Sequence, residues 1–456
     1  MYITKTAVTL LLACTMLLCA CQVDPLTGKS TLNLYSYEDE KAIGDENVQP
    51  IVAELGGLYP DAALQNYVNT VGQKVVTAGR SRLKDEAGFP DWEFNFYVVN
   101  TSMINAFALP GGHVFVTRGI LDRLKDESEL AGLLGHEVAH VFARHSVERM
   151  SEMTMMIIPA ALLASFEETQ GIAVVGIVAI QLLALKYSRD NESESDTFGM
   201  RFAARAGYRP DGIIGVMRML DEMMHEHGGG GPEFLSTHPD PGNRVDSLTR
   251  QMSKEYGNEK PEWFRGDVEY TGALVSMRKA QPAYVLADTG DALMAEGFEL
   301  FNNGNVEGAK AKYREALDNY RAAASAQPGH AILHVNLAQA NFYLGEYAQA
   351  EKHSRDALNL EPGSFWPNFM GGLVAIKAGD NGAAATRLAK ALELIPGSPV
   401  SMYYLAVAYD RNQNTNGAAE YYRRAYNAFN GEGEMAANAR QRLIEMGQPD
   451  PAPQPK

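Results

Sequence analysis

Residues 129–145 read ELAGLLGHEVAHVFARH, and the apolar residues in this stretch recur at the three- and four-residue spacing of an α-helix. Positions four residues apart share one face of a helix, so His136 and His140 point the same way. Glu137 lies beside them. Two imidazoles so placed can hold one zinc ion, and the neighbouring carboxylate can take a proton from the water that zinc activates. The stretch therefore predicts a helix with two metal ligands and a general base.

A catalytic zinc site needs a third protein ligand. The long metzincin pattern would place Gly at position 143 and His at position 146, but the chain has Ala143 and Ser146, which excludes that class. His145 follows His140 by five residues and lies about 140° around the helix from it. We therefore expect His145 to make a structural hydrogen bond rather than to bind the metal.

Residues 191–196, NESESD, resemble the second helix of gluzincin metallopeptidases, whose pattern is Asn-Glu-x-x-Ser-Asp. This resemblance implies that Glu192 is the third zinc ligand and that Asp196 orients a ligand histidine. The two residues are four apart and share a helical face, so one helix can supply both. Glu194 points to another face. The alternative interpretation is a solvated acidic face.

Together these segments resemble the M48 family of zinc metalloendopeptidases. In that family, a segment like residues 105–112, NAFALPGG, leads into the edge strand of the active site, and here it lies between the strand-like runs 94–100 and 113–117. An open edge can pair with an extended substrate backbone and would give little side-chain selectivity. An ordinary hairpin connection is the alternative.

Residues 235–239, LSTHP, followed by Arg244, match another element of the family. His238 could stabilise the tetrahedral oxyanion or bind zinc as an inhibitory fourth ligand. Arg244 could contact the same oxyanion or a carboxylate of the ligand helix. A loop histidine and a salt-bridged arginine are the alternative. We place both residues with Glu137 among the candidate catalytic residues.

Two other segments stand near these motifs. The apolar runs 154–166 and 171–185 are too short for membrane spans, so we expect a helical hairpin that acts as a lid or membrane-facing element, or else two core helices. His225 and His227 precede four glycines, and this segment is interpreted as a mobile loop rather than a second metal site.

The C-terminal half repeats itself with a period of 34 residues. Gly345, Ala350, Ala357 and Pro362 recur as Gly379, Ala384, Ala391 and Pro396, and Ala418 and Ala425 continue the series. The set Gly304, Ala309 and Ala316 precedes the next by 41 residues, which predicts about two more helical turns in the first unit. The pattern resembles the tetratricopeptide repeat, and stacked helix pairs of this kind form concave surfaces that bind peptides or proteins. A plain helical spacer is the alternative.

All three cysteines, Cys14, Cys19 and Cys21, lie within the first 21 residues. A disulfide scaffold and a thiol nucleophile in the body of the chain are therefore excluded.

Lys5 and a following apolar run are typical of a secretory signal. Residues 18–21, LCAC, resemble a bacterial lipobox, which implies lipidation of Cys21. Gln22 at the next position implies the inner leaflet of the outer membrane, with a soluble periplasmic protein as the alternative.

The chain has 40 Lys and Arg against 56 Asp and Glu, a net charge of −16, which disfavours nucleic-acid binding.

The expected fold class is α+β: a mostly helical, gluzincin-type metalloprotease domain with a small sheet, followed by an all-α tetratricopeptide-repeat solenoid. We divide the chain into a signal peptide (1–20), a tether (21–40), a protease domain (41–265), a connector (266–286), a repeat domain (287–446, with 434–446 as a capping helix) and a disordered tail (447–456).

The whole architecture resembles the β-barrel assembly-enhancing type of periplasmic M48 protease. This resemblance implies a metalloendopeptidase with one Zn²⁺ per chain that degrades misfolded or stalled outer-membrane proteins. The repeats would bind these clients or the assembly machinery, and the lipid anchor would hold the chain at the membrane. The alternative is a periplasmic chaperone or assembly scaffold that acts through the repeats, with a regulated or silent protease site.

Overall fold

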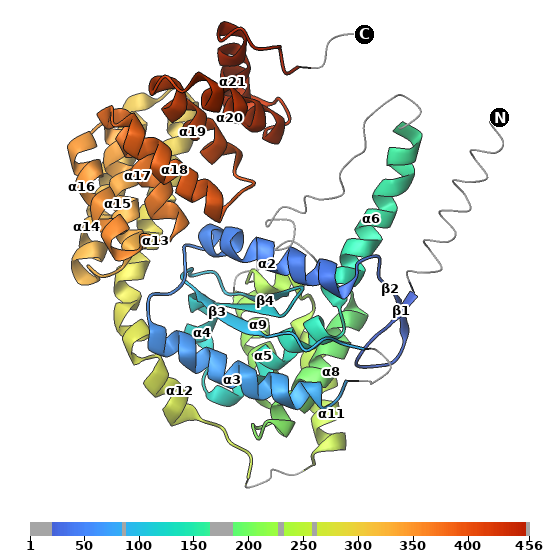
Figure 1. Cartoon of the computed structure of the whole chain (residues 1–456). Helices are drawn as coiled ribbons and strands as arrows, with labels where there is room; N and C mark the ends of the chain where they lie inside the picture. Colours follow the sequence, from blue (N-terminus) through green and yellow to red (C-terminus); the bar gives the residue numbers. More distant parts are fainter. Residues whose placement is uncertain (1–20, 84–87, 165–185, 227–231, 258–261, 453–456) are drawn as a thin grey trace, which may run out of the picture. The chain divides into compact units, whose positions relative to one another are not determined.

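The computed structural model describes residues 21–83, 88–164, 186–226, 232–257 and 262–452 (Figure 1). The chain divides into two compact units, residues 1–278 and 279–456. The expected fold class is confirmed, because the first unit is mostly helical with a small sheet and the second is all helical. The predicted signal peptide lies outside the described residues.

The first unit combines one small sheet and a hairpin with helices. Its elements are β1 (Cys21–Val23), β2 (Ser30–Leu32), α2 (Tyr37–Glu54), α3 (Ala62–Arg80), β3 (Asn95–Val99), β4 (Ala106–Leu109), β5 (His113–Thr117), α4 (Arg118–Arg123), α5 (Glu127–Phe142), α6 (His145–Ala164), α8 (Arg189–Arg205), α9 (Gly212–Glu226), α10 (Phe234–Thr237), α11 (Pro241–Glu255) and α12 (Asp267–Ala273).

The sheet has the order β3-β5-β4. β3 runs parallel to the central β5 and β4 runs antiparallel to it, so that Phe107 pairs with Phe115 and their rings stack. α3 contacts β3, and α5 contacts β4 (Figure 1). The segment 105–112 itself contains the edge strand β4 with its turn, whereas the run 113–117 into which it leads is the central strand β5. Among the described residues, β4 pairs with no strand on its outer side.

Helix α5 is the centre of this unit, and every one of its residues is buried. It packs closely on α8 because glycine faces glycine where the two helices touch. A Cβ on Gly135 would lie 2.7 Å from the carbonyl oxygen of Gly199, and a Cβ on Gly199 would lie 2.7 Å from the amide nitrogen of His136. The two glycines thus let the backbones of the two predicted ligand helices approach each other.

The segment predicted as a tether, residues 21–40, packs against this unit. β1 and β2 form an antiparallel hairpin, and α2 begins within the segment. The buried Arg144, which follows α5, donates from Nε to the buried Glu40 (2.5 Å) and from Nη2 to the carbonyl oxygen of Tyr35 (2.8 Å), and it also donates to the Gln22 side chain. These hydrogen bonds hold the N-terminal segment against the end of the ligand helix.

The apolar stretch 154–185 is described only in part. Its first residues belong to α6, and residues 165–185 lie outside the described residues, so the predicted hairpin stays a prediction. Across the described ranges, no helix combines the length and the apolar character that crossing a bilayer requires.

The second unit is a series of antiparallel helix pairs. Its helices are α13 (Val275–Asn302), α14 (Val306–Ala326), α15 (Ala331–Leu344), α16 (Tyr347–Leu360), α17 (Phe365–Ala378), α18 (Asn381–Leu394), α19 (Pro399–Arg411), α20 (Thr415–Ala428) and α21 (Gly433–Glu445). α14 has 21 residues where α16 and α18 have 14, which accounts for the seven extra residues of the first repeat. α21 lies where a capping helix was expected and packs on α20.

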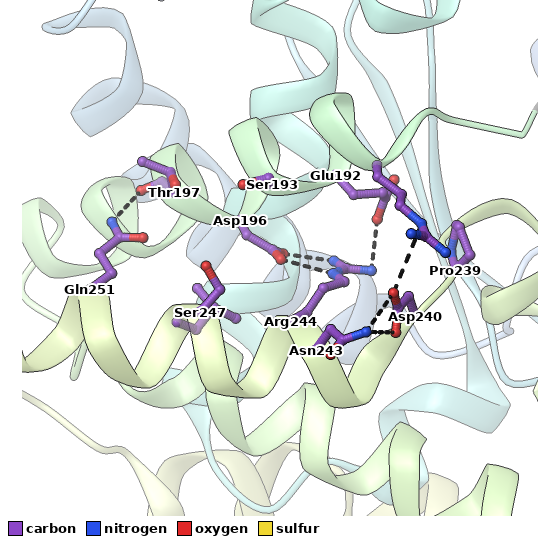
Figure 2. Close-up of a pocket in the computed structure, with 12 residues that line it drawn as sticks. Glu192, Ser193, Asp196, Thr197, Pro239, Asp240, Asn243, Arg244, Ser247 and Gln251 are labelled. Atoms are coloured by element: carbon purple, nitrogen blue, oxygen red, sulfur yellow. Dashed lines mark hydrogen bonds and ion pairs between the residues drawn. The ribbon is translucent and has the colours of Figure 1, made fainter.

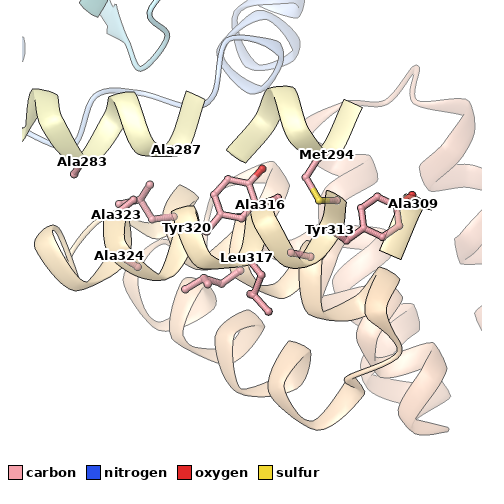
Figure 3. Close-up of a cluster of buried hydrophobic side chains, with 13 residues drawn as sticks. Ala283, Ala287, Met294, Ala309, Tyr313, Ala316, Leu317, Tyr320, Ala323 and Ala324 are labelled. Atoms are coloured by element: carbon pink, nitrogen blue, oxygen red, sulfur yellow. The ribbon is translucent and has the colours of Figure 1, made fainter. Parts of the chain in front are cut away.

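The repeated small residues mark the contacts between helices. All eight are fully buried: Ala309, Ala316, Ala350, Ala357, Ala384, Ala391, Ala418 and Ala425. Figure 3 shows the first of these contacts, where Tyr313 and Tyr320 of α14 lie against α13 beside Met294. Gly345 and Gly379 end their helices with φ of 80° and 82°, the left-handed conformation that favours glycine.

This packing predicts a difference between two alanines of one helix. Ala316 of α14 is fully buried, whereas Ala311 of the same helix is exposed. Ala316→Leu is expected to destabilise the repeat unit by about 1–3 kcal/mol, because a larger side chain does not fit between the helices. Ala311→Leu is expected to change stability by less than about 0.5 kcal/mol. Urea unfolding of both full-length variants, followed by circular dichroism, checks this, and equal effects would contradict the packing.

Candidate metal centre

Three side chains from α5 and α8 converge at the contact between these helices. The Nε2 atoms of His136 and His140 lie 3.0 Å apart, and the Glu192 carboxylate lies 3.6 Å from the first and 3.4 Å from the second. All three side chains are at most 2% exposed. The residues predicted to bind the metal are therefore brought together with their donor atoms facing one point.

The other ring nitrogens of the two histidines contact groups that can orient the rings. Nδ1 of His136 lies 3.0 Å from an oxygen of Asp196, which is the contact that the gluzincin resemblance implied. Nδ1 of His140 lies 3.0 Å from Nδ1 of His145, as expected for a structural hydrogen bond. Such contacts leave Nε2 of each ring directed at the metal position.

Arg244 of α11 pairs with two carboxylates of the ligand helix, those of Glu192 and Asp196. Its Nη1 forms an ion pair with an oxygen of Glu192 at 2.7 Å, and it donates hydrogen bonds from Nε and Nη2 to Asp196 (2.8 and 2.6 Å). Figure 2 shows the guanidinium between these two side chains, at a cavity of about 270 Å³ lined by residues of α8, of α11 and of the turn before α11. Of the two contacts considered for Arg244, the structure contains the one with the ligand-helix carboxylates.

His238 also reaches the centre. Its Nδ1 lies 2.9 Å from Glu192 and 3.3 Å from Nε2 of His136, and the ring of Phe234 stacks on it at 4.3 Å. His136, His140, Glu192 and His238 together form a buried group in which four donor atoms lie within 4.8 Å of one another. The position therefore allows a fourth ligand as well as a contact with the substrate.

Glu137 has the environment expected of a general base. Both of its carboxylate oxygens are buried and have no hydrogen-bond partner, and Nε2 of His238 lies 3.8 Å from one of them. Burial raises the pKa of Glu137. A buried unpartnered carboxylate costs free energy, which is tolerated where its oxygens serve a reaction.

The charges around the centre favour an ionised ligand carboxylate. Burial acts to raise the pKa of Glu192, but the positive charges of His238 and Arg244 hold this pKa well below its usual value. Burial lowers the pKa of His140 well below its usual value, which favours the neutral ring that binds metals. Two imidazoles, an ionised carboxylate and an unpartnered base are a donor set that fits zinc.

Some residues contribute to the centre without having been predicted to. The ring of Tyr187 packs on His140 with 4.0 Å between centroids, and its hydroxyl contacts Ser146 at 2.9 Å. Phe234 lies four residues before His238, and this helical spacing in the sequence could have indicated that the two rings stack. His225 is exposed at the end of α9 and outside the group of donors, and its neighbour His227 lies outside the described residues.

Comparisons with known proteins agree with this site and with the repeats. The model of peptidase family M48 matches residues 63–252, and a tetratricopeptide-repeat model matches residues 301–364 and 369–433. The beta-barrel assembly-enhancing protease of Yersinia pestis is 26% identical over 397 residues, which cover 84% of this chain and 73% of that protein. The mitochondrial metalloendopeptidase OMA1 of Bos taurus is 30% identical over 242 residues, which cover 50% of this chain and 45% of that protein.

Among solved structures, the MamA fragment of Desulfovibrio magneticus RS-1 matches with 20% identity and a TM-score of 0.29, over 36% of this chain and 85% of that chain. The family matches coincide with the two units that the fold displays, and the M48 match contains His136, His140 and Glu192. The chain therefore carries a peptidase family M48 domain followed by C-terminal tetratricopeptide repeats, and it is a metalloprotease.

Proposed function

We propose that this chain is a zinc-dependent endopeptidase of the bacterial periplasm that degrades misfolded or stalled outer-membrane proteins. The observation that carries the proposal is the convergence of His136, His140 and Glu192 beside the unpartnered carboxylate of Glu137. A zinc ion held by these three ligands would supply Lewis acidity to water and to the substrate carbonyl oxygen.

Residues of the chain transfer the proton, orient the metal ligands and bind the substrate. Glu137 takes the proton of the attacking water and passes it to the leaving amine. Asp196 orients His136, and Arg244 fixes Glu192 through an ion pair at 2.7 Å and Asp196 through hydrogen bonds of 2.8 and 2.6 Å. Strand β4 offers its outer edge to an extended substrate backbone, so that recognition depends more on the main chain than on side chains.

The substrate class rests on the relatives and on the repeats. The relative from Yersinia pestis is named for assembly of β-barrels, and its similarity covers 84% of this chain. In the repeat unit, an apolar groove of about 150 Å³ lies between α15 and α17 and is lined by Phe342, Trp366 and Phe369, among others. An aromatic groove of this kind suits exposed apolar segments of unfolded clients or of an assembly partner.

The proposed location rests on the sequence around Cys21. Residues 18–21, LCAC, and Gln22 indicate a lipid on Cys21 and attachment to the inner leaflet of the outer membrane. Labelling of cells with a radioactive fatty acid tests this anchor. Label on the natural chain but not on a Cys21→Ser variant supports it, and an unlabelled natural chain would leave the soluble periplasmic alternative.

Removal of the metal tests the function. The purified full-length chain is expected to cleave casein and an unfolded outer-membrane protein, to lose cleavage with 1,10-phenanthroline, and to regain it when Zn²⁺ is added. The rival is a chaperone or scaffold that acts through the repeats. If the metal-free chain supports insertion of a β-barrel client as well as the loaded chain does, the scaffold hypothesis gains and the protease proposal loses.

His238→Ala separates the two roles considered for this residue. If His238 stabilises the oxyanion, its removal lowers cleavage by about 100-fold or more, as expected for loss of one such donor. If it binds the metal as an inhibitory ligand, its removal raises cleavage. Because His136, His140 and Glu192 remain as three donors, we expect the metal to be retained in either case, which metal analysis of the variant checks.

A further inference from the structure

A second group of possible metal ligands lies in the repeat unit. His334 belongs to α15, and His353 and Asp356 belong to α16, the helix paired with it. His353 and Asp356 are three residues apart and share one helical face. The Oδ2 atom of Asp356 lies 3.9 Å from Nδ1 of each histidine, so that the carboxylate stands between the two imidazoles.

The hydrogen bonds of His334 define which of its nitrogens is free. Its Nε2 lies 3.0 Å from the carbonyl oxygen of Pro328, and a carbonyl can only accept, so Nε2 carries the hydrogen. In a neutral ring, Nδ1 then holds the lone pair. A metal-ligating histidine commonly donates its other ring N–H to a backbone carbonyl in this way. His334 therefore has the tautomer of a ligand.

The Nδ1 atoms of His334 and His353 are both available to bind a metal ion. Both are buried atoms without a hydrogen-bond partner. At 3.9 Å, the Asp356 carboxylate is too far away to be that partner. An acidic residue that merely neutralised protonated histidines would be expected at hydrogen-bond distance.

We propose that His334, His353 and Asp356 form a second metal site, which binds Zn²⁺ or a similar divalent transition-metal ion. Their donor atoms lie within 4.8 Å of one another, whereas bonds of 2.0–2.2 Å to a tetrahedral ion require separations of about 3.4 Å. The Asp356 side chain is 39% exposed and can move inward to shorten its two separations of 3.9 Å, and the two imidazoles would have to turn toward each other as the ion binds. Water completes the coordination from the open side.

Such an ion would tie the two helices of one repeat together. α15 contributes Phe342 to the apolar groove described above, so the bound ion would stiffen one wall of that groove. The inference does not depend on the function proposed for the first centre, because no residue is shared between the two sites.

Zn²⁺ binding by three tag-free, full-length variants tests the site. In the first, His136→Ala and His140→Ala remove the first centre. Equilibrium dialysis is expected to leave one equivalent of bound Zn²⁺ in this variant, and Co²⁺ is expected to give a visible absorption band. Adding His353→Ala is expected to weaken the remaining binding by about 100-fold or more, since loss of a ligand exceeds the 10–100-fold cost of losing an outer partner. Adding His225→Ala instead is the control and is expected to change nothing.

Two results would overturn the proposal. One is a first variant that binds no Zn²⁺, and the other is remaining binding that survives His353→Ala or disappears with His225→Ala. Circular dichroism checks that each variant is folded. If His353→Ala fails to fold, Asp356→Asn keeps the size of an exposed side chain and is expected to weaken Zn²⁺ binding by at least tenfold, so unchanged binding by that variant would also overturn the site.

Discussion

Glu137→Gln is expected to lower the rate of casein cleavage by about 100- to 10,000-fold while the metal content of the first centre stays unchanged. The amide has nearly the size of the carboxylate but cannot take a proton from water. Both carboxylate oxygens of Glu137 are buried and unpartnered, so the substitution breaks no hydrogen bond that holds the fold. Cleavage assays with metal analysis of the same sample measure both quantities.

The matched control is Glu194→Gln. Glu194 is a partly buried glutamate near the centre, with an oxygen 3.7 Å from Nε2 of His145, but it does not face the metal position. We expect this variant to keep activity within a few-fold of the natural chain. Normal cleavage by Glu137→Gln would show that Glu137 is not the general base. Loss of metal by the same variant would show that the effect of the substitution is structural.

The sequence predicted those parts of the centre whose residues lie close together on one helix. His136 and His140 share a face because four residues separate them, and Glu192 and Asp196 share a face for the same reason. Helical spacing alone therefore indicated which side chains act together. The repeats were predictable for a similar reason, because small residues such as Ala350 and Ala384 must recur wherever one helix pair contacts the next.

Contacts between segments far apart in the sequence could not be predicted from spacing. Arg144 connects Glu40 and Tyr35 to the end of α5, across more than 100 residues, and nothing in the pattern of residues 21–40 signalled a segment packed against the fold. The choice between two partners of Arg244 stayed open for the same reason. Which carboxylates its guanidinium meets depends on how α11 crosses α8, and the sequence of α11 does not specify this crossing.

Arg244→Met is expected to destabilise the metal-free protease unit by about 3–5 kcal/mol, because it leaves two buried carboxylates without their cation. Arg244 is 7% exposed, and Glu192 and Asp196 are 2% and 5% exposed. Urea unfolding followed by hydrogen–deuterium exchange in peptides of α8 reports on this unit separately from the repeats. Measurement without metal is essential, because a bound divalent ion would itself compensate Glu192.

The matched control lies between the same two helices. Arg201 of α8 pairs with Glu255 of α11, but these side chains are 31% and 27% exposed, so Arg201→Met is expected to cost about 0–1 kcal/mol. Adding Asp196→Asn to Arg244→Met removes one of the two buried carboxylates left without a cation, and it is expected to recover part of the lost free energy of unfolding. If Arg244→Met costs no more than Arg201→Met, the guanidinium does not hold the ligand helix in place. The positions of Glu192 and Asp196 would then have to follow from the packing of α5 on α8 alone.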